Sequence, residues 1–272
     1  MESDVTPPDP ADGRFPALRS PGFRLLWLGL TISAVGTKMQ DTTIRWHIYE
    51  LTHSMVALGL IGLCRFVPLF LCSMIGGGIA DANDRRKILL VTQSVMAAGA
   101  VTLGILTQAG TISAVAIYGV SALTAAALAF DSPARQSLVP NLVPRRHFSN
   151  AASLNSTAFK TATVAGPYAA GMLLQRGSIA VIYWINAASF LAVLTALLCI
   201  RAEETCRATG TRVPVTLSGF RDGLKFVWSQ PIQVWTIALD FLATFFAAAD
   251  ALLPVFARDI LHVNARGYGL LT

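Results

Sequence analysis

A cluster of charge between two long apolar stretches constrains the fold of this chain more than any other feature. The run GGGIADANDRRK, which ends at Lys87, holds five charged residues: Asp81, Asp84, Arg85, Arg86 and Lys87. A helix that leaves the hydrocarbon core of a membrane places its charges at that boundary, whereas a buried strand or a soluble helix has no reason to end so abruptly in charge. The run therefore predicts a tight turn between two membrane spans.

The composition supports this interpretation. Only 13% of the residues are charged and 54% are hydrophobic, whereas soluble domains have roughly 25% charged residues. A bilayer core needs roughly 20 apolar residues per helix. We therefore predict an all-α membrane protein, a polytopic helical bundle with seven spans: Phe23 to Tyr49, Met55 to Ala80, Ile88 to Thr107, Ile112 to Phe130, Ala151 to Leu174, Ile179 to Ile200 and Val234 to Phe256. An eighth apolar run begins at Tyr268 and is too short to cross a membrane, so we expect the chain to be a fragment.

The basic residues predict how the spans are oriented. They gather before the first span and after the second, fourth and sixth, while the alternate loops carry only Arg176, Arg258 and Arg266. Cytosolic loops of membrane proteins carry the excess of Lys and Arg, so we expect a cytosolic N-terminus. Four segments follow: a disordered, acidic and proline-rich cytosolic tail (1–22), a six-helix half (23–200), a cytosolic linker with an amphipathic surface helix (201–231) and the start of a second half (232–272).

Several other classes of protein lack support in the sequence. It contains no HExxH, P-loop or GxSxG signature, so we expect no enzyme activity. The four cysteines are not placed for an extracellular disulfide or a metal site. The pI is near 9.5, but the positive charge is spread over loops with no basic helix, which argues against nucleic acid. We therefore expect no cofactor, no metal ion and no nucleic-acid partner.

Six spans, a linker and further spans are the arrangement of transporters built from two halves. Within it, GGGIADANDRRK resembles the signature that the major facilitator superfamily carries between helices two and three, Gly-x-Leu-x-Asp-Arg-x-Gly-Arg-Arg. The residues that fit are Gly77, Ile79, Asp81, Arg85 and Arg86, whereas Ala82 and Asp84 depart from the pattern. In that superfamily the aspartate helps to hold one conformational state, so the resemblance implies a gating role for Asp81. The alternative is a loop aspartate that caps the next helix.

A second match lies in the fifth span, AGPYAAGMLL. Gly166, Pro167 and Gly171 resemble the Gly-Pro motif that exporters of this superfamily place in their fifth helix. The stretches FDSPARQSLVPNLVPRRHFSNAASLNS and SGFRDGLKFVWSQP resemble bacterial exporters of the enterobactin-exporter and macrolide-efflux type. The likeness covers nearly everything outside the tail, and it implies export of a drug-like or siderophore-like molecule across the cytoplasmic membrane.

A charged residue within a membrane span costs free energy, so such residues are functional candidates by default. The first span holds Lys38, Asp41 and Arg45 on one helix face, the second holds Arg65 and the fifth holds Lys160. We hypothesise that Asp41 carries the coupling proton; the alternative is a permanent Lys38–Asp41–Arg45 ladder that only holds helices together. Asp240 and Asp250 in the seventh span are rival carboxylates. The excess of cations favours an anionic or catechol-like substrate.

These observations together predict a secondary transporter that exports small molecules by proton antiport and works as a monomer when complete. Its two halves would rock around a site near the middle of the membrane. One alternative is a truncated membrane protein that does not transport, such as a scaffold or a decayed transporter. A membrane-embedded enzyme is a further alternative, disfavoured because no catalytic constellation is present.

Overall fold

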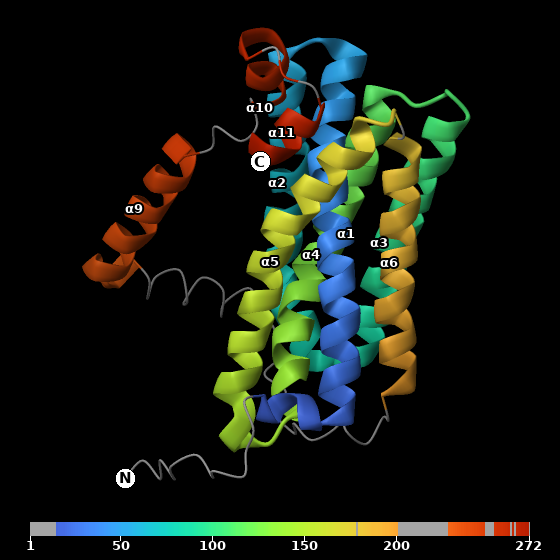
Figure 1. Cartoon of the computed structure of the whole chain (residues 1–272). Helices are drawn as coiled ribbons and strands as arrows, with labels where there is room; N and C mark the ends of the chain where they lie inside the picture. The colour runs from blue at the N-terminus through green and yellow to red at the C-terminus, as the bar shows by residue number, and fades with distance from the viewer. Residues whose placement is uncertain are drawn as a thin grey trace.

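The structure is a computed structural model that describes residues 15–177, 179–200, 228–247, 253–261, 263 and 265–271. All regular elements in these ranges are helical (Figure 1). Six long helices form the body of the molecule: α1 (Pro21–Thr52), α2 (Met55–Ala82), α3 (Arg85–Gln108), α4 (Ala114–Leu142), α5 (Phe148–Leu174) and α6 (Ile179–Cys199). The shorter elements are η1 (Pro16–Arg19), η2 (Arg145–His147), α9 (Pro231–Ala247), α10 (Leu253–Val255), the π-helical turn η4 (Phe256–Ile260) and α11 (Ala265–Leu271).

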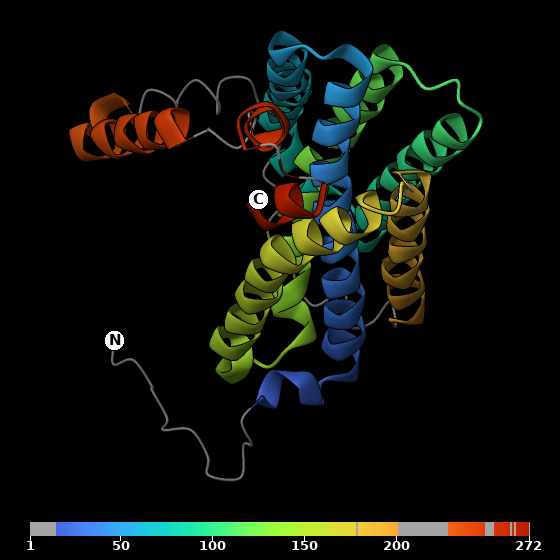
Figure 2. The ribbon, with the colours of Figure 1, turned by 45° about the horizontal axis from the view of Figure 1, so that its top comes forward.

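The six long helices run alternately up and down in one bundle. Helix α1 packs between α5 and α6, α3 packs against α4 and α6, and α2 packs along α4 (Figures 1 and 2). We call the end where α1, α3 and α5 begin the basic end, because the cationic side chains of Arg85, Arg86, Arg145 and Arg146 lie there. Helices α10 and α11 lie at the opposite end, beside α1 and α5, while α9 projects away from the bundle (Figure 1).

The apolar composition of the helices agrees with the prediction of an all-α membrane protein. Four described helical segments are long and apolar enough to cross a membrane: Met55–Met74, Arg85–Gln108, Ala114–Leu142 and Ile179–Cys199. Helices α1 and α5 are long enough but fall outside this set, and they carry Lys38, Asp41, Arg45 and Lys160, charged residues singled out in the sequence. In a helical membrane protein, polar helices face the interior of the bundle or an aqueous cavity.

Small residues bring α1 close to α6. A Cβ atom on Gly29 would lie 2.8 Å from the carbonyl oxygen of Ala192, and one on Gly36 would lie 2.5 Å from Oγ of Ser189. Near Gly36, the buried amide of Asn186 donates to Oε1 of Gln40 at 2.8 Å. Because lipid is as apolar as a leucine side chain, such close packing and hydrogen bonds between helices hold a membrane bundle together. These contacts fix α1 against α6.

The turn between α2 and α3 is tighter than the sequence predicted. Helix α2 continues to Ala82 and α3 begins at Arg85, so Asp81 lies in helix α2 and not in a loop. The residue that caps α3 is Asp84, whose carboxylate accepts a hydrogen bond from the backbone N–H of Arg86 at 3.0 Å. The alternative of Asp81 as the cap is therefore wrong, because the chain turns after it.

Two arginines tie this turn to other helices at the basic end. Arg85 donates from Nη1 to the carbonyl of Ser137 in α4 at 3.1 Å. Arg86 donates from Nε to the carbonyl of Leu197 at 2.7 Å and from Nη2 to that of Leu198 at 3.1 Å, both at the end of α6. A cation at the C-terminus of a helix satisfies carbonyls that lack an intrahelical partner and opposes the helix dipole. The two arginines thus join α3 to α4 and α6.

Two predicted span boundaries differ from the structure. The fourth span was predicted to end at Phe130, but α4 continues to Leu142 and includes Pro133 and Pro140. Ala134, Leu138 and Leu142 keep one face of the helix buried in this added part, which explains the continuation. The seventh span, predicted for Val234 to Phe256, is described as α9 up to Ala247 and again from α10 onward. Of the disordered tail predicted for 1–22, the described part holds η1 and the start of α1. The part before Phe15 and the linker helix lie outside the described residues.

Candidate functional site

A partly open cavity of about 380 Å³ lies between α1, α4 and α5, in the half of the bundle nearest the basic end. Its walls are mostly apolar and include two aromatic rings, Phe148 and Phe159. The residues that line it are Leu30, Thr31, Ala34, Arg135, Gln136, Val139, Phe148, Ala152, Asn155, Ala158 and Phe159. An apolar pocket with a few convergent polar groups is the usual form of a small-molecule site.

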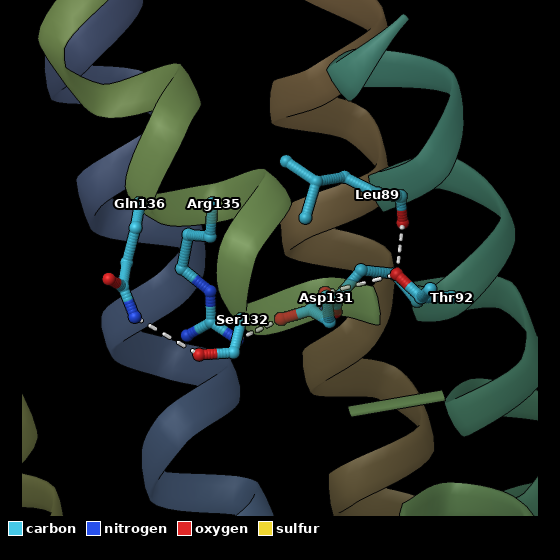
Figure 3. A network of polar contacts seen from close by, with 7 residues as sticks. Leu89, Thr92, Asp131, Ser132, Arg135 and Gln136 are labelled. Atoms are coloured by element: carbon cyan, nitrogen blue, oxygen red, sulfur yellow. Dashed lines mark hydrogen bonds and ion pairs between the residues drawn. The ribbon is translucent and has the colours of Figure 1, made fainter. Parts of the chain in front are cut away.

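Arg135 is the charged residue among those that line this cavity. Its Nη2 forms an ion pair with Oδ2 of Asp131, one turn earlier in α4 (Figure 3). The arginine side chain is 34% exposed, whereas the Asp131 side chain is fully buried. Nε of Arg135 is buried and has no hydrogen-bond partner within the described residues. The guanidinium therefore keeps donor capacity that the protein does not use.

Asp131 is held from the other side by α3. Its Oδ1 accepts hydrogen bonds from Oγ1 of Thr92 at 3.1 Å and from Nε2 of Gln93 at 2.7 Å. Figure 3 shows Thr92 and Arg135 approaching Asp131 from two different helices. The sequence analysis did not identify Asp131 or Arg135 as site residues, because it ended the fourth span before them. The buried-face spacing that continues through Leu138 is the signal that could have placed them within the helix.

Among the charged residues of the first span, Asp41 pairs with a different helix than the proposed ladder required. Its Oδ1 accepts a hydrogen bond from Nη2 of Arg65 in α2 at 2.6 Å, and the two side chains are 21% and 28% exposed. Within the described residues, Asp41 forms no ion pair with Lys38 or Arg45. The hypothesis of an ion-pair ladder along α1 is therefore wrong. The carboxylate instead joins α1 to α2.

Lys38 lies next to the cavity. Its Nζ is 5.0 Å from the centroid of the Phe159 ring, a distance suited to a cation–π interaction. Because Phe159 lines the cavity, this interaction brings a second cation to the end of the cavity nearer the middle of α1. Lys160, the next residue of α5, is exposed, and Arg45 is partly buried farther along α1.

Of the two rival carboxylates of the seventh span, the structure describes Asp240 alone. Asp240 is exposed on α9, which projects away from the bundle (Figure 1). Asp250 lies outside the described residues. The backbone of Gly77 and Asp81 is helical, and their side-chain environment also lies outside what the structure describes.

The helix-five motif forms two close contacts. A Cβ atom on Gly166 would lie 2.5 Å from Cβ of Lys38, so this glycine lets α5 approach α1. A Cβ atom on Gly269 of α11 would lie 2.7 Å from Cα of Gly171 and 2.6 Å from the carbonyl oxygen of Pro167. The motif residues therefore pack α5 against both α1 and the C-terminal segment.

Away from the basic end, α1 is joined to the C-terminal segment. The buried Tyr268 donates from its hydroxyl to the carbonyl of Thr42 at 3.1 Å, and its ring lies 5.2 Å from that of Trp46. The hydroxyl of Tyr49 donates to the carboxylate of Asp259. These contacts cover α1 at this end.

Comparison with known proteins identifies the family. Residues 12–272 match a family of the major facilitator superfamily that is described as transmembrane secretion effectors. The chain belongs to this family. The resemblance drawn from GGGIADANDRRK and the helix-five motif is confirmed at this level. Members of the major facilitator superfamily are transporters and not enzymes, in agreement with the prediction from the sequence.

Curated relatives of this major facilitator chain include exporters of different cargo. It is 26% identical over 255 residues to the staphyloferrin A transporter of Staphylococcus aureus, a match that covers 90% of this chain and 60% of the relative. It is 26% identical over 252 residues to the enterobactin exporter EntS of Citrobacter koseri, covering 92% and 59%. It is 21% identical over 261 residues to the multidrug efflux pump Tap of Mycolicibacterium fortuitum, covering 93% and 64%.

The chain spans about 60% of the length of these relatives. The matched part contains the six-helix bundle and the α1–α4–α5 cavity. Family membership, the apolar helices and these relatives agree that the chain is a multi-pass membrane protein.

Proposed function

We propose that this protein exports small amphipathic molecules across the cytoplasmic membrane, with the basic end of the bundle and the N-terminus in the cytosol. The observation that carries the proposal is the cavity between α1, α4 and α5, partly open, in the half of the bundle near the basic end. Contacts from Tyr268 and Asp259 cover α1 toward the other end. In transporters of this kind, alternating access exposes a site near the middle of the membrane to one side at a time.

The cargo that fits this cavity is siderophore-like or drug-like. Its apolar walls and the rings of Phe148 and Phe159 suit an aromatic or aliphatic body, and Arg135 and Lys38 favour an anionic or catechol-like group. The relatives, which include a staphyloferrin A transporter, an enterobactin exporter and a multidrug efflux pump, support the same cargo classes.

Proton antiport is the proposed source of energy, and Asp41 is the proposed proton carrier. Its carboxylate lies in a membrane-spanning helix, is partly exposed and depends on a single ion pair with Arg65. A group that changes partners during a transport cycle can bind a proton in one state and release it in another. Asp131 joins Asp240 and Asp250 as a rival, because it is a carboxylate within α4, a helix long and apolar enough to cross a membrane.

The gating role implied for Asp81 also stays a proposal. Arg85 and Arg86 donate hydrogen bonds to carbonyls of α4 and α6. A movement of these helices would therefore displace the α2–α3 turn. We propose that Gly166, Pro167 and Gly171 supply the close packing along which the two halves move, and that the complete transporter works as a monomer.

An efflux assay tests the proposed function. Cells that express the full chain would be loaded with carboxyfluorescein, an amphipathic anion, and the loss of fluorescence would be followed with and without a protonophore. We expect efflux above that of control cells and its loss when the proton gradient collapses. No efflux above the control would reject the proposal and favour the alternative of a membrane protein that does not transport. Efflux that persists without a proton gradient would reject proton antiport alone.

A further inference from the structure

The charge around the cavity is arranged in an unusual way. Arg135 is the charged group on its wall, and the remaining polar lining groups are the uncharged Thr31, Gln136 and Asn155. Directly behind Arg135, on the side away from the cavity, Asp131 holds the guanidinium through Nη2. An anion that enters the cavity therefore meets a cation that already has a counter-ion.

The two oxygens of Asp131 have different partners. Oδ1 accepts hydrogen bonds from Thr92 and Gln93 of α3, and Oδ2 accepts from Arg135. If Arg135 turned toward a ligand, the carboxylate would keep both hydrogen bonds from α3. A buried carboxylate that retains hydrogen-bond donors is far less costly than one left alone. The ion pair can therefore open without leaving Asp131 unpartnered.

The guanidinium is equally ready for a second partner. Its Nε is buried and has no hydrogen-bond partner within the described residues, while a third of the side chain as a whole is exposed. A guanidinium recognises planar carboxylates through two parallel hydrogen bonds, whereas Asp131 accepts from Nη2 of Arg135 alone. A ligand carboxylate can offer the bidentate geometry that the internal partner lacks.

We propose that Arg135 is the anion anchor of the cavity and that Asp131 is an internal competitor for it, which sets the selectivity of the site. A molecule is retained when its own carboxylate or similar planar oxyanion displaces Asp131 from the guanidinium. Neutral analogues of the same shape cannot do so and bind only through the apolar walls. This inference rests on the proposed role of the cavity as the cargo site and adds the chemical class of the cargo.

Equilibrium dialysis with two small aromatic probes tests the inference. The purified full chain in lipid nanodiscs would be titrated with radiolabelled salicylate and with salicylamide, which has nearly the same shape but no carboxylate. Asp131→Asn removes the competing charge, so we expect salicylate to bind about tenfold more tightly, since a hydrogen bond to a charged group is worth that much. Salicylamide binding should not change. A purely structural role of Asp131 would instead weaken the binding of both probes.

Two further variants make the result decisive. Arg145→Gln removes a positive charge, as Arg135→Gln does, but from an exposed position outside the cavity lining, and it should leave both affinities as they were. The double variant Asp131→Asn with Arg135→Gln removes both charges, so no uncompensated ion remains buried. We expect it to bind the two probes equally well and no less than the original chain binds salicylamide.

Salicylate binding that is unchanged or weaker in Asp131→Asn would overturn the inference, as would a salicylate preference that survives in the double variant. The result is separable from that of the efflux assay. Preferential salicylate binding without carboxyfluorescein efflux would refute the proposed transport but support the anion anchor. Efflux without any preference between the two probes would support the proposed transport but refute the anion anchor.

Discussion

Replacing Gly166 with alanine tests whether the helix-five motif is needed for packing between α1 and α5. The added methyl group would lie 2.5 Å from Cβ of Lys38 and 3.1 Å from the backbone nitrogen of Met39. Both neighbours are part of or next to the α1 backbone, so neither can rotate away. Overpacking of this kind costs about 1–3 kcal/mol. In a helix interior, replacing glycine with alanine also contributes up to about 1 kcal/mol of stabilisation.

Gly119→Ala is the matched control, because Gly119 is also inside a long helix and its Cβ would meet nothing within 4 Å. The gain in helix propensity is common to both variants, so their difference isolates the steric cost. At roughly 2–4 °C per kcal/mol, Gly166→Ala should unfold several degrees below Gly119→Ala. The assay is thermal unfolding of both variants in the same detergent, followed by size-exclusion chromatography. Equal unfolding temperatures would refute the claim that this glycine is required for close approach.

Three further predictions concern contacts of the helical bundle and of the proposed proton carrier. Arg86→Gln removes two hydrogen bonds to the end of α6, so thermal unfolding should show a loss of about 1–3 kcal/mol, whereas the exposed neighbour Lys87, changed to Gln as a control, should leave stability within about 0.5 kcal/mol. Asn186→Leu leaves the buried amide of Gln40 without its partner and should cost about 1–3 kcal/mol in the same measurement; no loss would mean that the pair does not hold α1 to α6. Asp41→Asn should abolish the dependence of carboxyfluorescein efflux on the proton gradient, and efflux that remains gradient-driven would exclude Asp41 as the proton carrier.

The positions of the long helices in the sequence were largely predictable, because membrane-spanning helices are long apolar runs. The boundaries of α3, α5 and α6 fall within three residues of the prediction, at positions where a charged or polar residue ends each run. The prediction failed at α4, which it ended at Phe130, directly before Asp131, Ser132 and Pro133. Pro133 lies inside a helix whose buried face continues to Leu142, so packing in the bundle overrides the local signal.

The candidate site could be predicted only in part, for a related reason. Intramembrane charge pointed to α1, which contributes the cavity wall at Thr31 and places Lys38 over Phe159. It could not show which charges meet, because Asp41 finds its partner in α2 rather than along its own helix. Sequence spacing describes neighbours on one helix, whereas a contact between helices depends on how each is rotated within the bundle.

The most direct test of the central claim is to block the cavity and measure export. A chain in which Cys64, Cys72, Cys199 and Cys206 are changed to serine would receive one new cysteine in the cavity wall, Ala158→Cys. Carboxyfluorescein efflux from cells would be measured before and after reaction with N-ethylmaleimide, with Gly119→Cys as the control outside the cavity. If the cavity is the cargo site, the reagent should abolish efflux for the cavity cysteine alone, and salicylate should slow the reaction. Efflux that continues unchanged after complete labelling of the cavity cysteine would contradict the account.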